Sequence, residues 1–207
     1  MTDPLAVLQR IRQSRPQEIP RAGEVCELCA EPIADEHGHL VDLQARTLLC
    51  ACRGCYLLFV SVGAGGAHFK SIPDRYTTLP DFSLSPAQWD ALQIPVSVAF
   101  FFRNSSLNRI AAFYPGPAGA TESELPLDTW AEVTRANPLL GTLEPDVEAL
   151  LVRSPPNQGG AECYIVPIDA CYELVGHLRM LWRGFDGGQE ANAKLDAFFD
   201  DVRSRVR

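Results

Sequence analysis

Apolar runs in the second half of the chain predict most of its β-strands. Residues 96–102 form an apolar run interrupted only by Ser97, which is typical of a central strand buried on both faces. Residues 109–114 follow after the turn-like segment 104–108, so these two runs predict a hairpin. Further strands are expected at residues 148–152, 163–168 and 172–182. Only a few residues around Asp169 and Ala170 separate the last two, which predicts a second hairpin.

Helices are expected where apolar residues recur at intervals of three and four. Such segments lie at residues 4–14, 86–92, 127–136 and 188–205. The last segment carries one apolar stripe, formed by Leu195, Phe198, Phe199, Val202 and Val206. Strand pairs with short connections and intervening helices predict an α+β fold whose sheet is mainly antiparallel.

Prolines and glycines divide the chain into three predicted parts. Residues 1–20 hold an N-terminal helix that ends at Pro16 and Pro20, residues 21–70 hold a cysteine-rich metal-binding module, and residues 80–207 form the α+β domain. The glycine-rich residues 62–68 are expected to be a flexible exit from the module. The proline- and glycine-rich residues 114–123 are expected to be a loop from a strand to a helix.

Composition and charge limit where the protein is expected to be located and which partners it is expected to bind. With 46% hydrophobic and 21% charged residues, the 207-residue chain has the composition of a soluble globular protein. We expect a cytoplasmic protein without membrane insertion, because no apolar run reaches about 18 residues and the first residues do not resemble a signal peptide. The net charge of −8 and the lack of a basic block argue against nucleic acid as a partner.

Five of the seven cysteines lie close together in the sequence, and their spacing predicts a metal site. Cys26 and Cys29 form one C-x-x-C pair, and Cys52 and Cys55 form another. Four thiolates suit a tetrahedral zinc ion, which would stabilise a module too small to have its own core. Residues 39–44 and 46–50 are expected to pair as strands about Gln44 and Ala45. Pair, hairpin, pair and helix is the order of a treble-clef finger, although a rubredoxin-like module uses the same ligands.

The identity of the third ligand stays open at this point. There are 22 residues between Cys29 and Cys52, slightly more than usual, and 20 between Cys29 and Cys50. We favour Cys52 as the ligand, with Cys50 as its alternative; the unused thiol is then either buried or a redox or metal-transfer group. His37 and His39 are interpreted as surface or hairpin residues, since the cysteines already satisfy one ion.

Zinc is favoured over iron, and catalysis is not indicated. Rubredoxin sites place glycine after the second cysteine of each pair, whereas this chain has Ala30 and Tyr56 there. The usual signatures of nucleotide, dinucleotide, serine-hydrolase and metalloprotease sites do not occur. Thr121, Glu122 and Ser123 could contribute to a ligand site in the loop 115–123, but a simple connection is favoured. Cys163 and Cys171 are expected to be two buried free thiols.

Several segments together resemble a known bacterial family. They are Cys26 to Cys29, Cys50 to Cys55, and residues 88–102, 113–123 and 171–176. The family they resemble has no established activity and accompanies nickel–iron hydrogenase genes, especially in actinobacteria. The resemblance covers residues 24 to about 200. It implies a zinc-binding, non-catalytic accessory protein that assists hydrogenase assembly or maturation through contact with a hydrogenase subunit; the alternative is a rubredoxin-like iron electron carrier.

Overall fold

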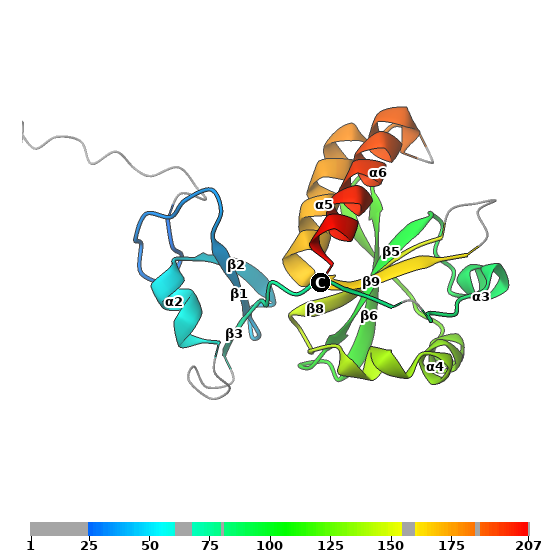
Figure 1. Cartoon of the computed structure of the whole chain (residues 1–207), viewed down its shortest axis with the longest axis horizontal. Coiled ribbons are helices and arrows are strands. Elements are labelled where there is room, and N and C mark those ends of the chain that lie inside the picture. Colours follow the sequence, from blue (N-terminus) through cyan, green and yellow to red (C-terminus); the bar gives the residue numbers. More distant parts are fainter. Residues whose placement is uncertain (1–24, 61–67, 80, 155–159, 185–186, 207) are drawn as a thin grey trace, which may run out of the picture.

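The computed structural model describes residues 25–60, 68–79, 81–154, 160–184 and 187–206. A small cysteine-rich module and a larger α+β part follow one another along the chain (Figure 1). The helix predicted at residues 4–14 lies outside the described residues, as does most of the predicted flexible exit at 62–68. The chain is a mixture of helices and antiparallel sheets, which confirms the predicted α+β class. The division into three parts stays a prediction.

The module is built on a three-stranded antiparallel sheet in the order β2-β1-β3. Its strands are β1 (Gly38–Asp42), β2 (Thr47–Ala51) and β3 (Phe69–Ser71), and helix α2 (Arg53–Leu58) follows β2 directly. The turn between β1 and β2 is closed by Asp42, whose Oδ1 accepts the backbone N–H groups of Gln44 and Ala45. The predicted hairpin about these two residues is therefore confirmed.

The two faces of the β1–β2 hairpin have different roles. Leu40 and Ala51 point to the face that carries the small core around the cysteines. Val41 and Leu48 point to the other face and join the core of the larger part. This alternation follows from the two-residue period of a strand, and it sends His39 and Cys50 away from the small core.

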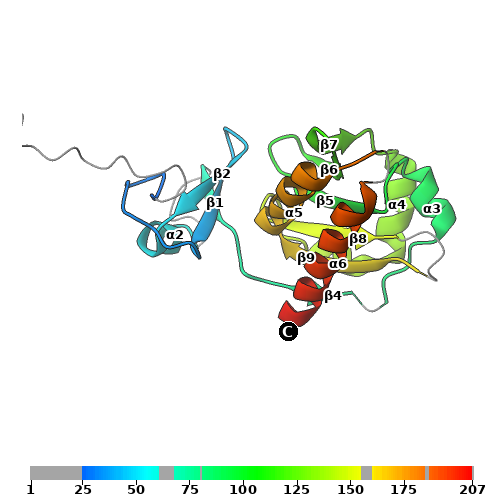
Figure 2. The ribbon, with the colours of Figure 1, turned by 90° about the horizontal axis from the view of Figure 1, so that it is seen from above.

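The larger part is a six-stranded, wholly antiparallel sheet in the order β4-β9-β8-β5-β6-β7. Its strands are β4 (Thr77–Thr78), β5 (Val98–Asn104), β6 (Arg109–Gly116), β7 (Gly119–Ser123), β8 (Glu148–Arg153) and β9 (Glu162–Pro167). Helices α5 (Ile168–Leu181) and α6 (Gly188–Arg205) cover one face (Figure 2). The other face is covered by α3 (Pro86–Ala91), α4 (Leu127–Ala136) and the 3-10 helix η1 (Pro138–Thr142).

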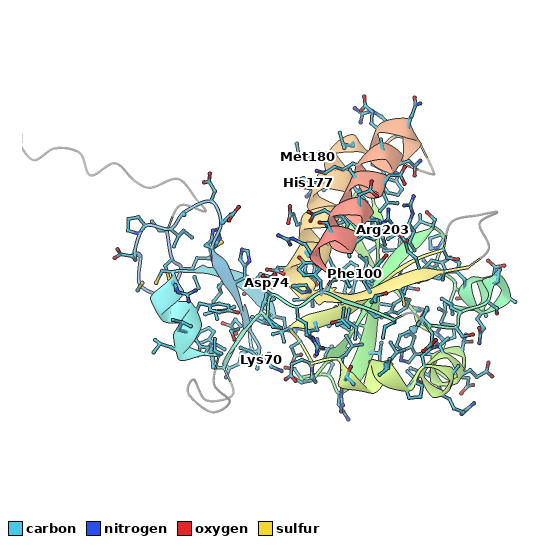
Figure 3. All side chains as sticks on the ribbon, viewed as in Figure 1. Lys70, Asp74, Phe100, His177, Met180 and Arg203 are labelled. Atoms are coloured by element: carbon cyan, nitrogen blue, oxygen red, sulfur yellow. The ribbon has the colours of Figure 1, made fainter. Side chains whose placement is uncertain are left out.

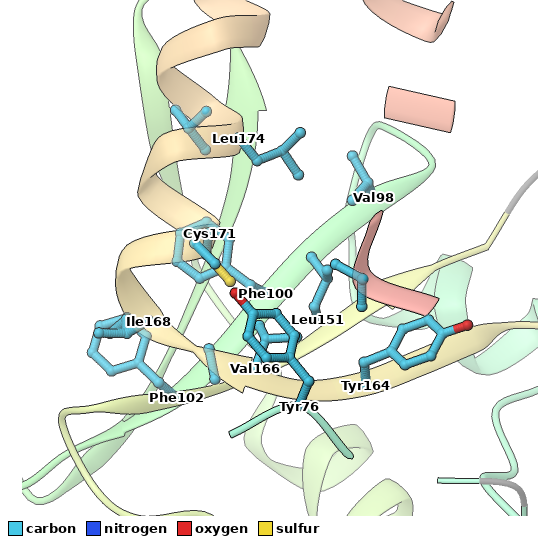
Figure 4. Close-up of a cluster of buried hydrophobic side chains, with 14 of the residues drawn as sticks. Tyr76, Val98, Phe100, Phe102, Leu151, Tyr164, Val166, Ile168, Cys171 and Leu174 are labelled. Atoms are coloured by element: carbon cyan, nitrogen blue, oxygen red, sulfur yellow. The ribbon is translucent and has the colours of Figure 1, made fainter. Parts of the chain in front are cut away.

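Successive side chains of the central strands point to opposite faces of the six-stranded sheet and so contribute to the hydrophobic core on each face. Phe100 of β5 points to the α5 face, where it lies beside Leu151 and Val166 (Figure 4). Its neighbour Phe101 points the other way and stacks on Trp130 of α4, with 4.7 Å between the ring centroids. Both phenylalanines are almost completely buried. The apolar run at 96–102 was thus correctly predicted to be a strand covered on both faces.

The predicted strand at 172–182 and its hairpin are wrong, because this segment is helix α5. Its buried positions include Cys171, Leu174, Val175 and Leu178, which recur at intervals of three and four rather than two. Asp169 lies in the first turn of the helix, where a carboxylate interacts favourably with the helix dipole. The apolar content of the segment suggested a strand, but its period is that of a helix.

The predicted loop at 114–123 is also wrong. Residues up to Gly116 extend β6, and Gly119 begins β7 after a two-residue turn. Proline is tolerated at Pro115 because the pairing of β6 with β5 ends at Phe113, so a backbone N–H at Pro115 would have no acceptor on that side. Gly119 has a φ of +111°, a conformation that favours glycine.

Candidate metal centre

The first half of the cysteine cluster is a tight turn that carries Cys26 and Cys29. The N–H of Cys26 donates to the carbonyl of Glu31 at 2.8 Å, and the N–H of Ala30 donates to the carbonyl of Cys26 at 2.8 Å. Ala30 has a φ of +61°, the left-handed conformation that glycine adopts most easily. The turn therefore has the geometry for which glycine is typical, although an alanine stands there.

The second half of the cluster opens helix α2. Cys52 is the N-cap residue of α2, and its Sγ accepts the N–H of Cys55 at 3.4 Å. The Sγ atoms of Cys29 and Cys52 are 3.7 Å apart, and the four sulfurs of Cys26, Cys29, Cys52 and Cys55 all lie within 4.8 Å of one another. A tetrahedral zinc ion with Zn–S bonds of about 2.3 Å needs sulfurs roughly 3.8 Å apart. The four cysteines can therefore hold one metal ion.

Because the four sulfurs lie close together, the pKa values of their thiols differ widely. Burial would raise the pKa of the Cys26 thiol, but hydrogen bonds from the backbone of Cys52, Leu28 and Cys29 bring it down to about 6. The pKa of Cys55 is raised to about 12 by its hydrogen bond with Cys29, by burial and by its hydrogen bond with Cys26. A cation among the sulfurs would relieve this competition and favour four thiolates.

The apolar core of the module is small. Among the described residues, the cluster around the cysteines has only Cys26, Leu40 and Ala51 fully buried. Tyr56 closes one side, because its ring lies against Gly38 so closely that a Cβ there would come within 2.5 Å of it. The Tyr56 hydroxyl also donates to the carbonyl of Ile72 at 2.8 Å. With so few buried residues, the module would gain stability from a metal ion held by the four cysteines.

The module contacts the larger part through hydrogen bonds and an ion pair. Nδ1 of His39 donates to Oδ2 of Asp169 at the start of α5, at 2.7 Å. Ser106, between β5 and β6, donates to the carbonyl of Leu43 at 3.1 Å. Lys70, on β3, lies between the module and the larger part (Figure 3). It forms an ion pair with Glu144 and donates to the carbonyl of Pro145. These contacts join β1, the β1–β2 turn and β3 of the cysteine-rich module to the larger part.

A cavity of about 580 Å³ lies at this junction. The β1–β2 hairpin supplies one wall with Arg46 and Leu48, and the large sheet and α5 supply others with Phe102, Arg109 and Tyr172. The hairpin that carries part of the cysteine cluster therefore also forms one wall of the cavity.

The structure separates Cys50 from the other four cysteines. Cys50 lies opposite His39 in the β1–β2 pairing, and its Sγ groups with ring nitrogens of His37 and His39 within 4.8 Å. The sequence interpretation missed this group because it assigned His37 and His39 to the surface or the hairpin, on the ground that the cysteines already satisfy one ion; His39 does lie in the hairpin. The signal was nevertheless present, since a turn centred on Gln44 and Ala45 places residue 39 opposite residue 50.

Within the described parts of the chain, the remaining sequence candidates form no further metal cluster. Cys163 and Cys171 are buried free thiols, as expected, and they belong to the cores on opposite faces of the sheet. Burial raises the pKa of Cys163 to about 12 and raises that of Cys171 as well. Glu122 of β7 forms an ion pair with Arg109 at 2.6 Å, and both side chains line the cavity at the junction.

Comparison with known proteins places the chain in a family. Within the described residues, no helix is long and apolar enough to cross a membrane. A search of the curated proteins finds no match, and neither does a search of the solved structures. A family model, described as a family of unknown function (DUF5947), matches residues 25–206, which include the cysteine cluster and the whole large sheet. The chain therefore belongs to the DUF5947 family of unknown function.

Proposed function

We propose that Cys26, Cys29, Cys52 and Cys55 bind a structural zinc ion in a treble-clef-like module. The observation that carries this proposal is the set of four sulfurs within 4.8 Å, one pair of them at 3.7 Å, in a module with few buried side chains. The order of tight turn, hairpin and helix supports the treble-clef assignment. Four protein ligands leave no open position, so the ion has a structural rather than a catalytic role.

Zinc suits this arrangement better than a rubredoxin-like iron centre. A rubredoxin site is built from two similar turns, each with glycine after its second cysteine, whereas here the second pair opens helix α2 and Tyr56 is helical. The two halves are therefore unlike. An iron site would give a coloured, redox-active protein after expression with added iron, and we expect a colourless protein that contains zinc.

We further propose that the protein is a non-catalytic accessory factor that acts by contacting another protein in a reducing, cytoplasmic environment. All seven cysteines are free, which supports that environment. Three large apolar side chains at α2 and just beyond it are exposed, namely Leu57, Leu58 and Val60. Apolar side chains grouped on a surface are typical of protein contacts. The expectation that the partner is an immature nickel–iron hydrogenase subunit rests on the family resemblance alone.

Two experiments test these proposals separately. Elemental analysis of protein expressed without added metal should give one zinc per chain, and Ser in place of Cys26, Cys29, Cys52 or Cys55 should abolish it. The variant Cys50→Ser is the matched control and should retain that zinc. For the partner, tagged protein should co-purify with hydrogenase subunits, and deletion of the gene should lower hydrogenase activity. Normal hydrogenase activity in the deletion strain would contradict the accessory role.

A further inference from the structure

The second cluster, formed by His37, His39 and Cys50, is placed by the hairpin itself. His39 and Cys50 are direct cross-strand partners, so their side chains leave the sheet on the same face. His37 precedes His39 by two residues and lies on that face as well, with the two rings 4.8 Å apart between centroids. The face is opposite to the one that carries Leu40, Ala51 and the four-cysteine core. The two clusters are thus back to back on one hairpin.

Each histidine has one ring nitrogen fixed by an acceptor, which leaves the other free to bind a metal. Nδ1 of His37 is 2.8 Å from the carbonyl oxygen of Ala34, and a carbonyl can only accept, so Nδ1 carries the proton. Nδ1 of His39 donates in the same way to the carboxylate of Asp169 at 2.7 Å. In both rings the lone pair of neutral imidazole is therefore on Nε2. A histidine oriented by a carboxylate or carbonyl in this way is typical of metal ligands.

The free nitrogen of His37 is buried without a partner. Its Nε2 is shielded from solvent and has no hydrogen-bond partner among the described residues. A buried polar atom without a partner costs about 1–3 kcal/mol, so native proteins rarely leave one unsatisfied. A metal ion bound by this lone pair, together with the sulfur of Cys50, would satisfy it.

We propose that His37, His39 and Cys50 form a second metal site, for a zinc-class divalent ion bound by two imidazoles and one thiolate. Imidazole and thiolate ligands together favour zinc and similar transition metals over magnesium or calcium. One ring nitrogen of each histidine and the Cys50 sulfur lie within 4.8 Å of one another, and a tetrahedral ion needs its ligand atoms about 3.5 Å apart. Small adjustments of the Cys50 side chain and of the two rings about their Nδ1 bonds would complete the site.

This second site differs from the four-cysteine site in two ways. It has three protein ligands, so a fourth position is open to water or to a small anionic ligand, as in exchangeable and catalytic zinc sites. It also depends on the larger part of the protein, because Asp169 of α5 orients His39. Metal binding at this site therefore strengthens the attachment of the metal module to the sheet domain.

Metal titration of the full chain tests the site. Protein that carries one zinc is dialysed against Zn²⁺, and bound metal is counted by elemental analysis. The wild-type chain should bind a second equivalent, whereas Cys50→Ser and His37→Gln should keep the first and lose the second. His68→Gln is the matched control, because His68 is in the same module but faces Asp42, and it should bind two. Asp169→Asn should lower the affinity for the second zinc ion about 10- to 100-fold.

Titration with Co²⁺ gives an independent readout. Binding of the second equivalent should add thiolate-to-cobalt absorption in the wild-type chain that is missing in Cys50→Ser. A wild-type chain that binds a single equivalent in excess metal, or a Cys50→Ser variant that still binds two, would overturn the proposal. Retention of the first zinc and an unchanged Tm show that a variant is folded. Loss of the first zinc from the wild-type chain would instead contradict the proposed structural site.

Discussion

The variant Ala30→Gly should bind zinc more tightly than the wild-type chain. Ala30 has a φ of +61° in the turn that carries Cys26 and Cys29. This left-handed conformation costs an alanine about 1–2 kcal/mol. Glycine adopts it freely but loses about 0.5–1 kcal/mol more backbone entropy on folding. The difference leaves about 0.7 kcal/mol in favour of glycine, which corresponds to roughly a threefold tighter site.

Competition with a colorimetric chelator measures this change directly. Because the module depends on the metal for its stability, the gain in turn geometry should appear in the apparent zinc affinity. Ala45→Gly is the matched control: Ala45 is exposed in the β1–β2 turn and is not among the residues with positive φ. It should not tighten zinc binding. An unchanged or weaker zinc affinity in Ala30→Gly would refute the assignment of strain to the turn.

Four further predictions concern the metal and the larger part of the protein. Chelation of zinc should raise amide exchange in β1 and β2 but not in β5 and β8; equal protection in all four strands would contradict the structural role of the metal. Glu148→Gln should lower the free energy of unfolding in urea by about 2 kcal/mol, because the almost fully buried carboxylate loses its charge-assisted bond to the half-exposed Arg75. A change below about 0.5 kcal/mol would disprove this role of the ion pair. Phe101→Ala should cost about 3–5 kcal/mol in the same assay, and a smaller loss would mean that its stack on Trp130 collapses readily. Burial raises the pKa of the Tyr76 hydroxyl from 10.0 to about 12. The unfolded state therefore loses the hydroxyl proton at lower pH than the folded state, and the free energy of unfolding should fall between pH 10 and 12. A Tyr76→Phe variant should show a smaller fall across that range.

Regular periodicity made several elements predictable from the sequence. The helices at 127–136 and 188–205 were predicted with the bounds that the structure has, because their apolar stripes are strong and prolines or glycines mark their ends. The strands around Phe100 and Leu150 were predicted because both faces of the sheet are covered, which gives unbroken apolar runs.

Other features depended on contacts that the sequence does not contain. The segment of helix α5 is apolar enough to resemble a strand. Its buried residues recur at intervals of three and four, and which of its residues are buried is known only from their contacts with the sheet. The β7 strand begins at Gly119 in a segment whose prolines and glycines are typical of loops, and only its pairing with β6 makes it a strand. The partnership of His39 with Asp169 joins residues 130 positions apart, so no local pattern could reveal it.

The most direct test of the central claim is zinc K-edge X-ray absorption of the protein as isolated with one equivalent of metal. The account predicts a single shell of four sulfurs at about 2.3 Å, and no change in that shell in the Cys50→Ser variant. A shell with nitrogen ligands at about 2.0 Å, or one that loses a sulfur in Cys50→Ser, would contradict the assignment of Cys26, Cys29, Cys52 and Cys55 as the zinc ligands.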